Sequence, residues 1–341
     1  TVAYRFEIRR QVEFHEDPCF PPNPALGDRR TRHVTSADFA FQLMRIADPA
    51  INSPVRSNFA KIVGLAAFSK RLAAKRKSDP AFTAQPINEQ YAKAGGIAGI
   101  GTPDDHTLEI VLSQADPKIL YWFAMPFTTA LPHEAVAYYD GKGGRRRLAD
   151  HPVGTGPFIL TTYDKQFRMI LERNTRWWGR AQPKAPAVMF PSEGGPEDVA
   201  AGSIDPSYVG RAMPFLSRIE FRREREGIPR FNKFLQGYYD QGGIIKESFD
   251  AVIQNDRLSP EMEKRGMRLD KTVRPSIFYI GFNMDDPIVG RAGDERSRKL
   301  RQAMSLVIDV KRYLQLFLNG RGVPAESLLP PGLFGYEATY R

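Results

Sequence analysis

The stretch 151–179 constrains the fold of this chain more than any other part of the sequence. Gly154 and Gly156 follow one another closely and allow backbone angles that are closed to other residues. Apolar and polar residues then alternate over 158–161 and again over 169–171, which is the period of a β-strand. Because a short polar turn separates the two runs, the pattern predicts a glycine-led β-hairpin.

Length and composition are those of a large globular protein. The chain has 341 residues, and single hydrophobic cores stop growing near ~250–300 residues, so two or more domains are expected. The hydrophobic fraction of 42% is ordinary for globular proteins. No apolar run approaches the ~18 residues that a membrane helix needs. No leader with a charged and an apolar region is visible, so we expect one to be removed or to lie outside this sequence.

Neither the net charge nor the single cysteine decides the functional class of the protein. The net charge is +10, which is compatible with a nucleic-acid partner, but the arginines are scattered in short groups. Because no basic helix is interleaved with base-stacking aromatics, a solvated basic surface is the favoured interpretation. Cys19 has no second cysteine to pair with, and its loop context predicts an incidental thiol.

Local patterns predict several elements in the first half of the chain. Alternation over 4–8 predicts a strand, and Leu108, Ile110 and Leu112 mark another. Residues 99–106 are expected to form a turn. Thr35-Ser-Ala-Asp38 has the form of a capping box, so a helix is expected from there to Asp48-Pro49.

The second half contains the longest predicted helix. Apolar residues recur at helical spacing over 300–318, with Gly320 at the position of a C-terminal glycine. Residues 276–282 are apolar on both faces and predict a central strand covered by helices. A further strand is expected from Ile219 and a short helix over 231–238. The mixture indicates an α/β or α+β fold. Irregular connections are expected at 16–34, 140–151 and 181–213.

The sequence resembles the extracellular solute-binding proteins of the peptide and nickel class, which are receptors of ABC importers. The most specific block is Pro152-Val-Gly-Thr-Gly-Pro-Phe158 followed by Leu171-Glu-Arg-Asn174 and Trp177-Trp178-Gly179. Four further blocks resemble the family in the same order, at 4–15, 34–49, 97–112 and 278–332. Members of this family continue well beyond the last block.

The resemblance implies an α/β fold of the type II periplasmic-binding-protein kind, with two lobes and an additional α+β domain. It also implies these limits: an additional domain at 1–130, part of the first ligand lobe at 131–245, and the start of an incomplete second lobe at 246–341. Two such lobes close around a solute about a hinge.

The function that the resemblance implies is capture of oligopeptides or dipeptides in the periplasm or at a membrane tether. The chain is then expected to be a monomer that delivers peptide to an ABC permease with its ATPase subunits. A nickel chelate, a sugar or an opine is the alternative ligand, because fold does not choose between ligands. By resemblance, the ligand-binding residues are Met125, Phe127, Thr128, Tyr279 and Asn283. The alternatives are a core aromatic for Tyr279 and a turn-forming side chain for Asn283.

Two other functional classes compete with a receptor. An enzyme lacks support, because His133-Glu134 has no second histidine at zinc-ligand spacing and no serine-nucleophile motif occurs. Asp285, Asp286 and Asp294 do not have the spacing of an EF-hand loop, so no metal and no cofactor are expected. A basic nucleic-acid-binding protein is the third class, and it predicts binding that weakens steeply with salt.

Overall fold

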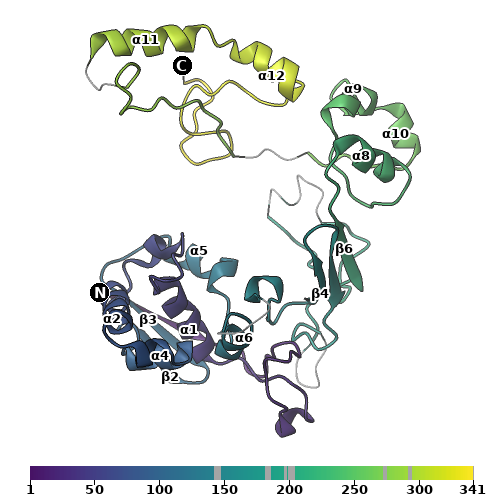
Figure 1. The fold of residues 1–341 in the computed structure, drawn as a ribbon. Coiled ribbons are helices and arrows are strands. Elements are labelled where there is room, and N and C mark those ends of the chain that lie inside the picture. The colour runs from purple at the N-terminus through teal and green to yellow at the C-terminus, as the bar shows by residue number, and fades with distance from the viewer. Residues whose placement is uncertain are drawn as a thin grey trace. The chain divides into compact units, whose positions relative to one another are not determined.

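The computed structural model describes residues 1–141, 147–180, 186–195, 198, 204–271, 275–290 and 294–340. The chain divides into two compact units, Thr1–Arg223 and Glu224–Arg341, called unit 1 and unit 2 below. Figure 1 shows the elements of both units along the chain. No helix among the described residues is long and apolar enough to cross a membrane.

Unit 1 begins with a three-stranded antiparallel sheet in the order β1-β3-β2. β1 (Val2–Glu7) pairs with β3 (Thr107–Leu112), which pairs in turn with β2 (Ile100–Asp104). The first and third strands were predicted, but the turn expected over 99–106 was placed too widely. Only residues 105 and 106 form the turn, because the residues before them pair with β3.

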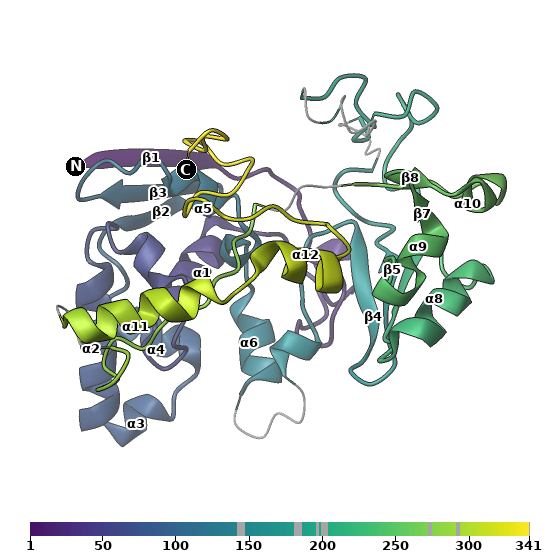
Figure 2. The ribbon, with the colours of Figure 1, turned by 90° about the horizontal axis from the view of Figure 1, so that it is seen from above.

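Helices cover one side of this sheet and build the main core. They are α1 (Ser36–Ala47), α2 (Leu65–Ser78), the single turn α3 (Pro80–Thr83) and α4 (Ile87–Lys93). Figure 2 shows α1, α2 and α4 together on the same side of the strands. The most completely buried members of this core are Phe59, Phe68, Leu72, Tyr91, Ile110 and Leu112.

The start and end of α1 confirm the predicted capping box. The amide of Thr35 donates to Oδ2 of Asp38 at 2.9 Å, and the helix ends at Ala47 with Asp48 as its C-cap. Reciprocal capping satisfies amides that the first helical turn leaves without partners. The helix that starts in this way packs against β2 and β3.

A second antiparallel sheet confirms the predicted hairpin and the predicted third strand. It has the order β4-β5-β6, formed by Phe158–Asp164, Arg168–Arg173 and Arg218–Arg222. Leu160 lies opposite Leu171 and Thr162 lies opposite Ile170, so Thr161 is an extra residue in β4. Such a bulge bends a strand and increases its twist.

Short elements lie in the connections of unit 1. They are η1 (Pro24–Leu26), η2 (Arg56–Phe59), α5 (Ile119–Phe123), η3 (Pro126–Thr128), α6 (His133–Tyr139) and η4 (Leu148–Asp150). The connection 16–34 is irregular except for η1, as expected, yet Phe14, Phe20 and Val34 are buried with Tyr139 and Val153. Parts of the connections expected at 140–151 and 181–213 lie outside the described residues.

Unit 2 is built mainly from short helices. Its elements are α8 (Gly227–Leu235), η5 (Lys246–Ser248), α9 (Phe249–Val252), β7 (Ile253–Gln254), β8 (Arg257–Leu258), α10 (Pro260–Lys264), α11 (Glu295–Leu306) and α12 (Val310–Leu318). A small core joins Phe231, Ile245, Val252 and Met262. The helix expected over 231–238 begins earlier, at Gly227.

Two predictions for unit 2 are wrong. The residues expected to form a central strand at 276–282 have no strand conformation, and Phe278 is 91% exposed. A strand needs neighbours for its amides and carbonyls, and the described residues supply none here. The single helix expected over 300–318 is two helices, because Asp309 accepts the amide of Arg312 and caps a new helix start.

Candidate functional site

The segment between α5 and α6 carries three of the predicted ligand-binding residues. Met125 is exposed, Phe127 packs on Phe59 with ring centroids 6.1 Å apart, and Thr128 is buried. The Thr128 hydroxyl lies 2.8 Å from the carbonyl oxygen of Met125 and 2.9 Å from that of Phe123. Its hydrogen-bonding capacity is therefore used to hold the turn, while Met125 is the member of the group that faces solvent.

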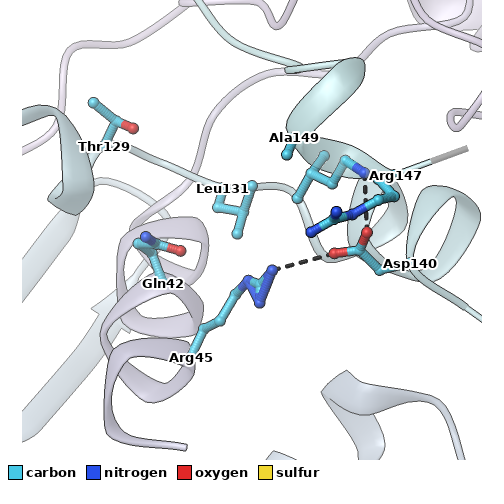
Figure 3. A pocket seen from close by; sticks show the side chains of 8 residues that line it. Gln42, Arg45, Thr129, Leu131, Asp140, Arg147 and Ala149 are labelled. Atoms are coloured by element: carbon cyan, nitrogen blue, oxygen red, sulfur yellow. Dashed lines mark hydrogen bonds and ion pairs between the residues drawn. The ribbon is translucent and has the colours of Figure 1, made fainter. Parts of the chain in front are cut away.

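A hollow of about 310 Å³ lies directly beside this segment. Four parts of unit 1 line it: α1, the residues after η3, the end of α6, and the start of η4. Figure 3 shows the side chains of Gln42 and Arg45 entering from α1, with Asp140 and Arg147 on the opposite side. The lining residues are Gln42, Arg45, Thr129, Leu131, Asp140, Arg147, Leu148 and Ala149. We call this hollow the α1–α6 pocket.

Hydrogen bonds fix the polar groups of the α1–α6 pocket. Asp140 accepts the Arg45 guanidinium at 3.2 Å through Oδ2 and the Leu148 amide at 2.9 Å through Oδ1. Gln42 donates from Nε2 to the carbonyl of Phe127 at 2.7 Å. That bond orients the carboxamide and leaves its buried Oε1 with no partner among the described residues. A buried acceptor without a donor is uncommon in folded proteins.

A second hollow, of about 420 Å³, lies where the chain leaves β1 and where β2 turns into β3. Its lining mixes charges of both signs and two histidines, and the buried Nδ1 of His106 has no partner among the described residues. No group of three or more metal-binding side chains occurs in the described part of the chain. The residues that line it are Arg10, Gln11, His33, Val34, Thr35, Asp105 and His106.

Arg32 links the connection 16–34 to α1 and α6. Its guanidinium donates to both carboxylate oxygens of Asp38, at 2.9 and 2.7 Å, and to both of Glu134, at 2.7 and 2.8 Å. Burial raises the pKa of Glu134, but the Arg32 hydrogen bonds outweigh it and the net pKa is lowered. Glu134 therefore serves as a structural ion-pair partner of Arg32.

The other two predicted ligand-binding residues lie in unit 2. Tyr279 is 81% exposed, so the alternative of a buried core aromatic does not hold in this structure. Asn283 accepts the amide of Asp285 through Oδ1 at 3.1 Å, which is the turn interaction expected as its alternative. A ligand contact by either residue stays a prediction.

Sequence reasoning missed the polar residues of the α1–α6 pocket. Arg45 belongs to one of the family-like blocks, but its partner Asp140 follows 95 residues later. Nothing in local spacing joins two residues so far apart. Residues 140–151 were expected only as an irregular connection, which gave no indication of a pocket.

The sequence model of the bacterial extracellular solute-binding proteins, family 5, matches residues 2–341. The chain belongs to this family. The match covers the hairpin, both hollows and the two units, and it confirms the resemblance seen in the five sequence blocks.

Curated relatives are similar along nearly the whole of this chain. The peptide transport periplasmic protein SapA of Salmonella typhimurium is 24% identical, over 98% of this chain and 47% of its own length. The dipeptide-binding protein of Escherichia coli is 21% identical, over 98% of this chain and 48% of its own length. The chain thus spans about half the length of these curated relatives.

Solved structures show the same fold. The DppA protein of Helicobacter pylori in complex with the peptide STSA aligns with a TM-score of 0.59 at 18% identity, covering 100% of this chain and 51% of that chain. The murein tripeptide binding protein MppA of Escherichia coli aligns with a TM-score of 0.59 at 16% identity, covering 98% and 50%. These alignments confirm an α/β fold of the type II periplasmic-binding-protein kind.

Proposed function

We propose that this chain belongs to the solute-capturing component of an ABC importer and that its solute is a peptide. The observation that carries the proposal is membership of family 5 over residues 2–341, together with relatives named for peptide transport or dipeptide binding. A receptor of this kind binds its solute between two lobes and has no need of a catalytic group. We infer a binding role rather than catalysis.

The proposed setting follows from the same relatives. SapA of Salmonella typhimurium is named as a periplasmic protein, so we place this receptor in the periplasm or on a membrane tether outside the cell. Its partners are then a permease and the ATPase subunits that drive it. We expect such a receptor to be a monomer that does not bind nucleic acid. The proposal also includes domain boundaries at residues 130 and 245.

Ligand contacts are proposed at Met125, Phe127, Thr128, Tyr279 and Asn283. Exposure of Met125 and Tyr279 supports the first and fourth of these. Backbone groups and aromatic walls suit a peptide receptor, because hydrogen bonds to a peptide backbone ignore side-chain identity. Peptides of different sequence can then share one site.

Native mass spectrometry of the protein at its natural length tests the ligand class. A bound mass that fragments as a peptide, and that a mixture of dipeptides and tripeptides displaces, is the expected result. Haem deserves a parallel titration, since the heme-binding protein A of Haemophilus influenzae is 23% identical over 98% of this chain. Retention of haem, a nickel chelate, a sugar or an opine, with no peptide binding, would overturn the peptide proposal.

Tyr279→Ala tests the proposed aromatic wall. We expect peptide affinity to fall by roughly tenfold or more, because large aromatic side chains dominate binding surfaces. Isothermal titration calorimetry with a bound peptide identified as above measures the change. Tyr340→Ala, which removes another exposed tyrosine of unit 2, is the matched control and should leave affinity unchanged. Equal affinities for both variants would remove Tyr279 from the site.

A further inference from the structure

The α1–α6 pocket has an excess of positive charge. Arg45 and Arg147 both line it, and Asp140 is the only acidic residue in its lining. Asp140 pairs with Arg45 at 3.2 Å, whereas no ion pair of Arg147 occurs within the described ranges of the chain. Figure 3 shows the Arg147 side chain directed toward the space between Leu131 and Asp140. One guanidinium is thus left to meet an anion.

The pocket also has apolar walls. Leu131, Leu148 and Ala149 supply apolar surface, and the volume of about 310 Å³ is at the lower end for ligand pockets. An acid with a short alkyl group would place its carbon atoms on these walls. A guanidinium matches the two oxygens of a carboxylate in a planar, bidentate arrangement, which a monatomic anion does not offer.

We propose that the α1–α6 pocket is a binding site for a small carboxylate, which Arg147 recognises together with Arg45. The site lies wholly in unit 1 and is independent of the proposed capture of peptide by the complete receptor. Asp140 opposes ligand binding beside Arg45, because its negative charge repels a second carboxylate at the same guanidinium. Loss of the Arg147 charge should therefore weaken carboxylate binding, whereas loss of the Asp140 charge should strengthen it.

Calorimetric titration with acetate in a carboxylate-free buffer of low ionic strength is the direct test. Acetate is expected to bind saturably in the millimolar range, and acetamide, which has the same shape without the charge, is expected not to bind. Arg147→Gln should weaken acetate by roughly tenfold, the usual scale for a hydrogen bond to a charged group. Arg5→Gln, an exposed arginine of β1 outside the lining, is the matched control and should leave binding unchanged.

Asp140→Asn separates ligand recognition from a general loss of structure. The asparagine Oδ1 still accepts the Leu148 amide, while the negative charge that holds Arg45 is gone. Acetate should therefore bind several-fold more tightly to this variant, which damage to the fold would not produce. Equal binding of acetate and acetamide, equal behaviour of the Arg147 and Arg5 variants, or weaker acetate binding to Asp140→Asn would each overturn the proposal.

A free small acid and the C-terminal carboxylate of a peptide share the chemistry of this site. Triglycine added in place of acetate distinguishes them, since only a peptide end that fits the pocket would bind with the same dependence on Arg147. Peptide capture by the complete receptor is read separately, through the Tyr279→Ala variant. Loss of acetate binding with unchanged peptide binding in Arg147→Gln would assign the two events to different sites.

Discussion

At the scale of single residues, two described carboxylates lie in the interior of unit 1. Asp38 and Asp48 are almost fully buried. Arg76 of α2 binds Asp48, and Arg32 binds Asp38 together with Glu134, which lies 102 residues from Arg32 in the sequence. A buried carboxylate is tolerated only when partners replace its lost hydration. Each arginine therefore joins, through its ion pairs, segments that are separate in the sequence, and we call this its fastener role.

Arg32→Met removes one such fastener. Asp38, whose side chain is 4% exposed, and Glu134 would lose their shared partner, so we expect the free energy of unfolding to fall by about 3 kcal/mol or more. Urea titration followed by tryptophan fluorescence suits the measurement, because all three tryptophans lie in unit 1.

Arg218→Met on β6 is the control for this loss, because its ion pairs are exposed and such pairs contribute about 0–1 kcal/mol. A loss in Arg32→Met no larger than in the control would contradict the fastener role.

We expect His15 to make the stability of unit 1 depend on pH. Its Nδ1 accepts the Gly154 amide at 3.3 Å, and burial lowers the pKa of His15, against the opposing charge of Asp17. The unfolded chain then binds a proton more readily than the folded one. The free energy of unfolding therefore keeps its full value above ~6.5, the pKa of histidine in the unfolded chain, and it falls as the pH drops below that value.

His15→Asn retains an acceptor for the Gly154 amide but has no proton to gain. We expect the thermal midpoint of the natural sequence to fall between pH 7 and pH 5, and that of the variant to fall less. The pH range of this experiment stays above 4.5, which is the ordinary pKa of a glutamate. Because the pKa values of Glu13 and Glu134 are lowered from 4.5, these groups do not titrate within the range. The exposed His33→Asn serves as the control. Parallel pH curves for all three proteins would refute the assignment.

At the scale of elements, one carboxylate joins three helices. Asp48 ends α1, accepts two bonds from Arg76 of α2 at 2.6 and 2.8 Å, and accepts the Tyr91 hydroxyl of α4 at 2.9 Å. Burial and the neighbouring Asp48 carboxylate raise the pKa of Tyr91, so its hydroxyl remains a donor. The packing of α4 on the core is thereby coupled to the end of α1.

Tyr91→Phe keeps the ring in the core and deletes the hydroxyl. One hydrogen bond to a charged acceptor is lost, for which we expect about 2 kcal/mol lower free energy of unfolding. The same fluorescence-monitored urea titration applies. Tyr138→Phe, which alters an exposed tyrosine of α6, should change stability by a few tenths of a kcal/mol at most. Similar midpoints for the two variants would show that the helices do not depend on this bond.

Elements whose signal is local were predicted from the sequence. The α1 capping box, the alternation of β3 and the turn between β4 and β5 each depend on residues near one another in the chain. The wrong predictions concern elements that depend on residues distant in the sequence or on a break in a continuing pattern. Residues 276–282 have the composition of a central strand, but a strand exists only when other segments pair with it. The start of α12 at Asp309 was missed because apolar spacing continues across the break.

The candidate site was less predictable for the same reason. Phe127 and Thr128, which resemblance predicts as ligand-binding residues, do not line the α1–α6 pocket, whose lining comes from α1, the residues after η3 and the residues after α6. Arg45 and Asp140 each look like ordinary surface charges in their own segments. Only the fold brings them to 3.2 Å, so spacing along the chain cannot reveal the pair.

At the scale of the whole molecule, the two units differ in how much apolar surface they bury. Unit 1 has a large core and a second cluster behind the connection 16–34, whereas the core of unit 2 joins four buried residues. Described residues such as Leu306, Val307 and Phe317 remain exposed in unit 2. Resistance to unfolding is therefore expected to be unequal along the chain.

Limited proteolysis of the full chain tests this inequality. We expect the first cuts within 275–290, where the described backbone is irregular and exposed, while fragments that contain α1 to α4 persist. Mass spectrometry of the timed digest identifies each cut. Early cleavage inside α1, α2 or β3, at a rate similar to that in 275–290, would contradict unequal protection.

The lone thiol of this chain has a practical consequence. Burial and the nearby Asp17 raise the pKa of Cys19, so at neutral pH it stays protonated and reacts slowly with alkylating reagents. A cysteine placed at exposed Ala25 in unit 1, and another at exposed Lys299 in unit 2, would each accept a spectroscopic label while Cys19 remains unlabelled. The natural sequence can therefore serve, without removal of Cys19, for measuring the distance between a dye in unit 1 and a dye in unit 2.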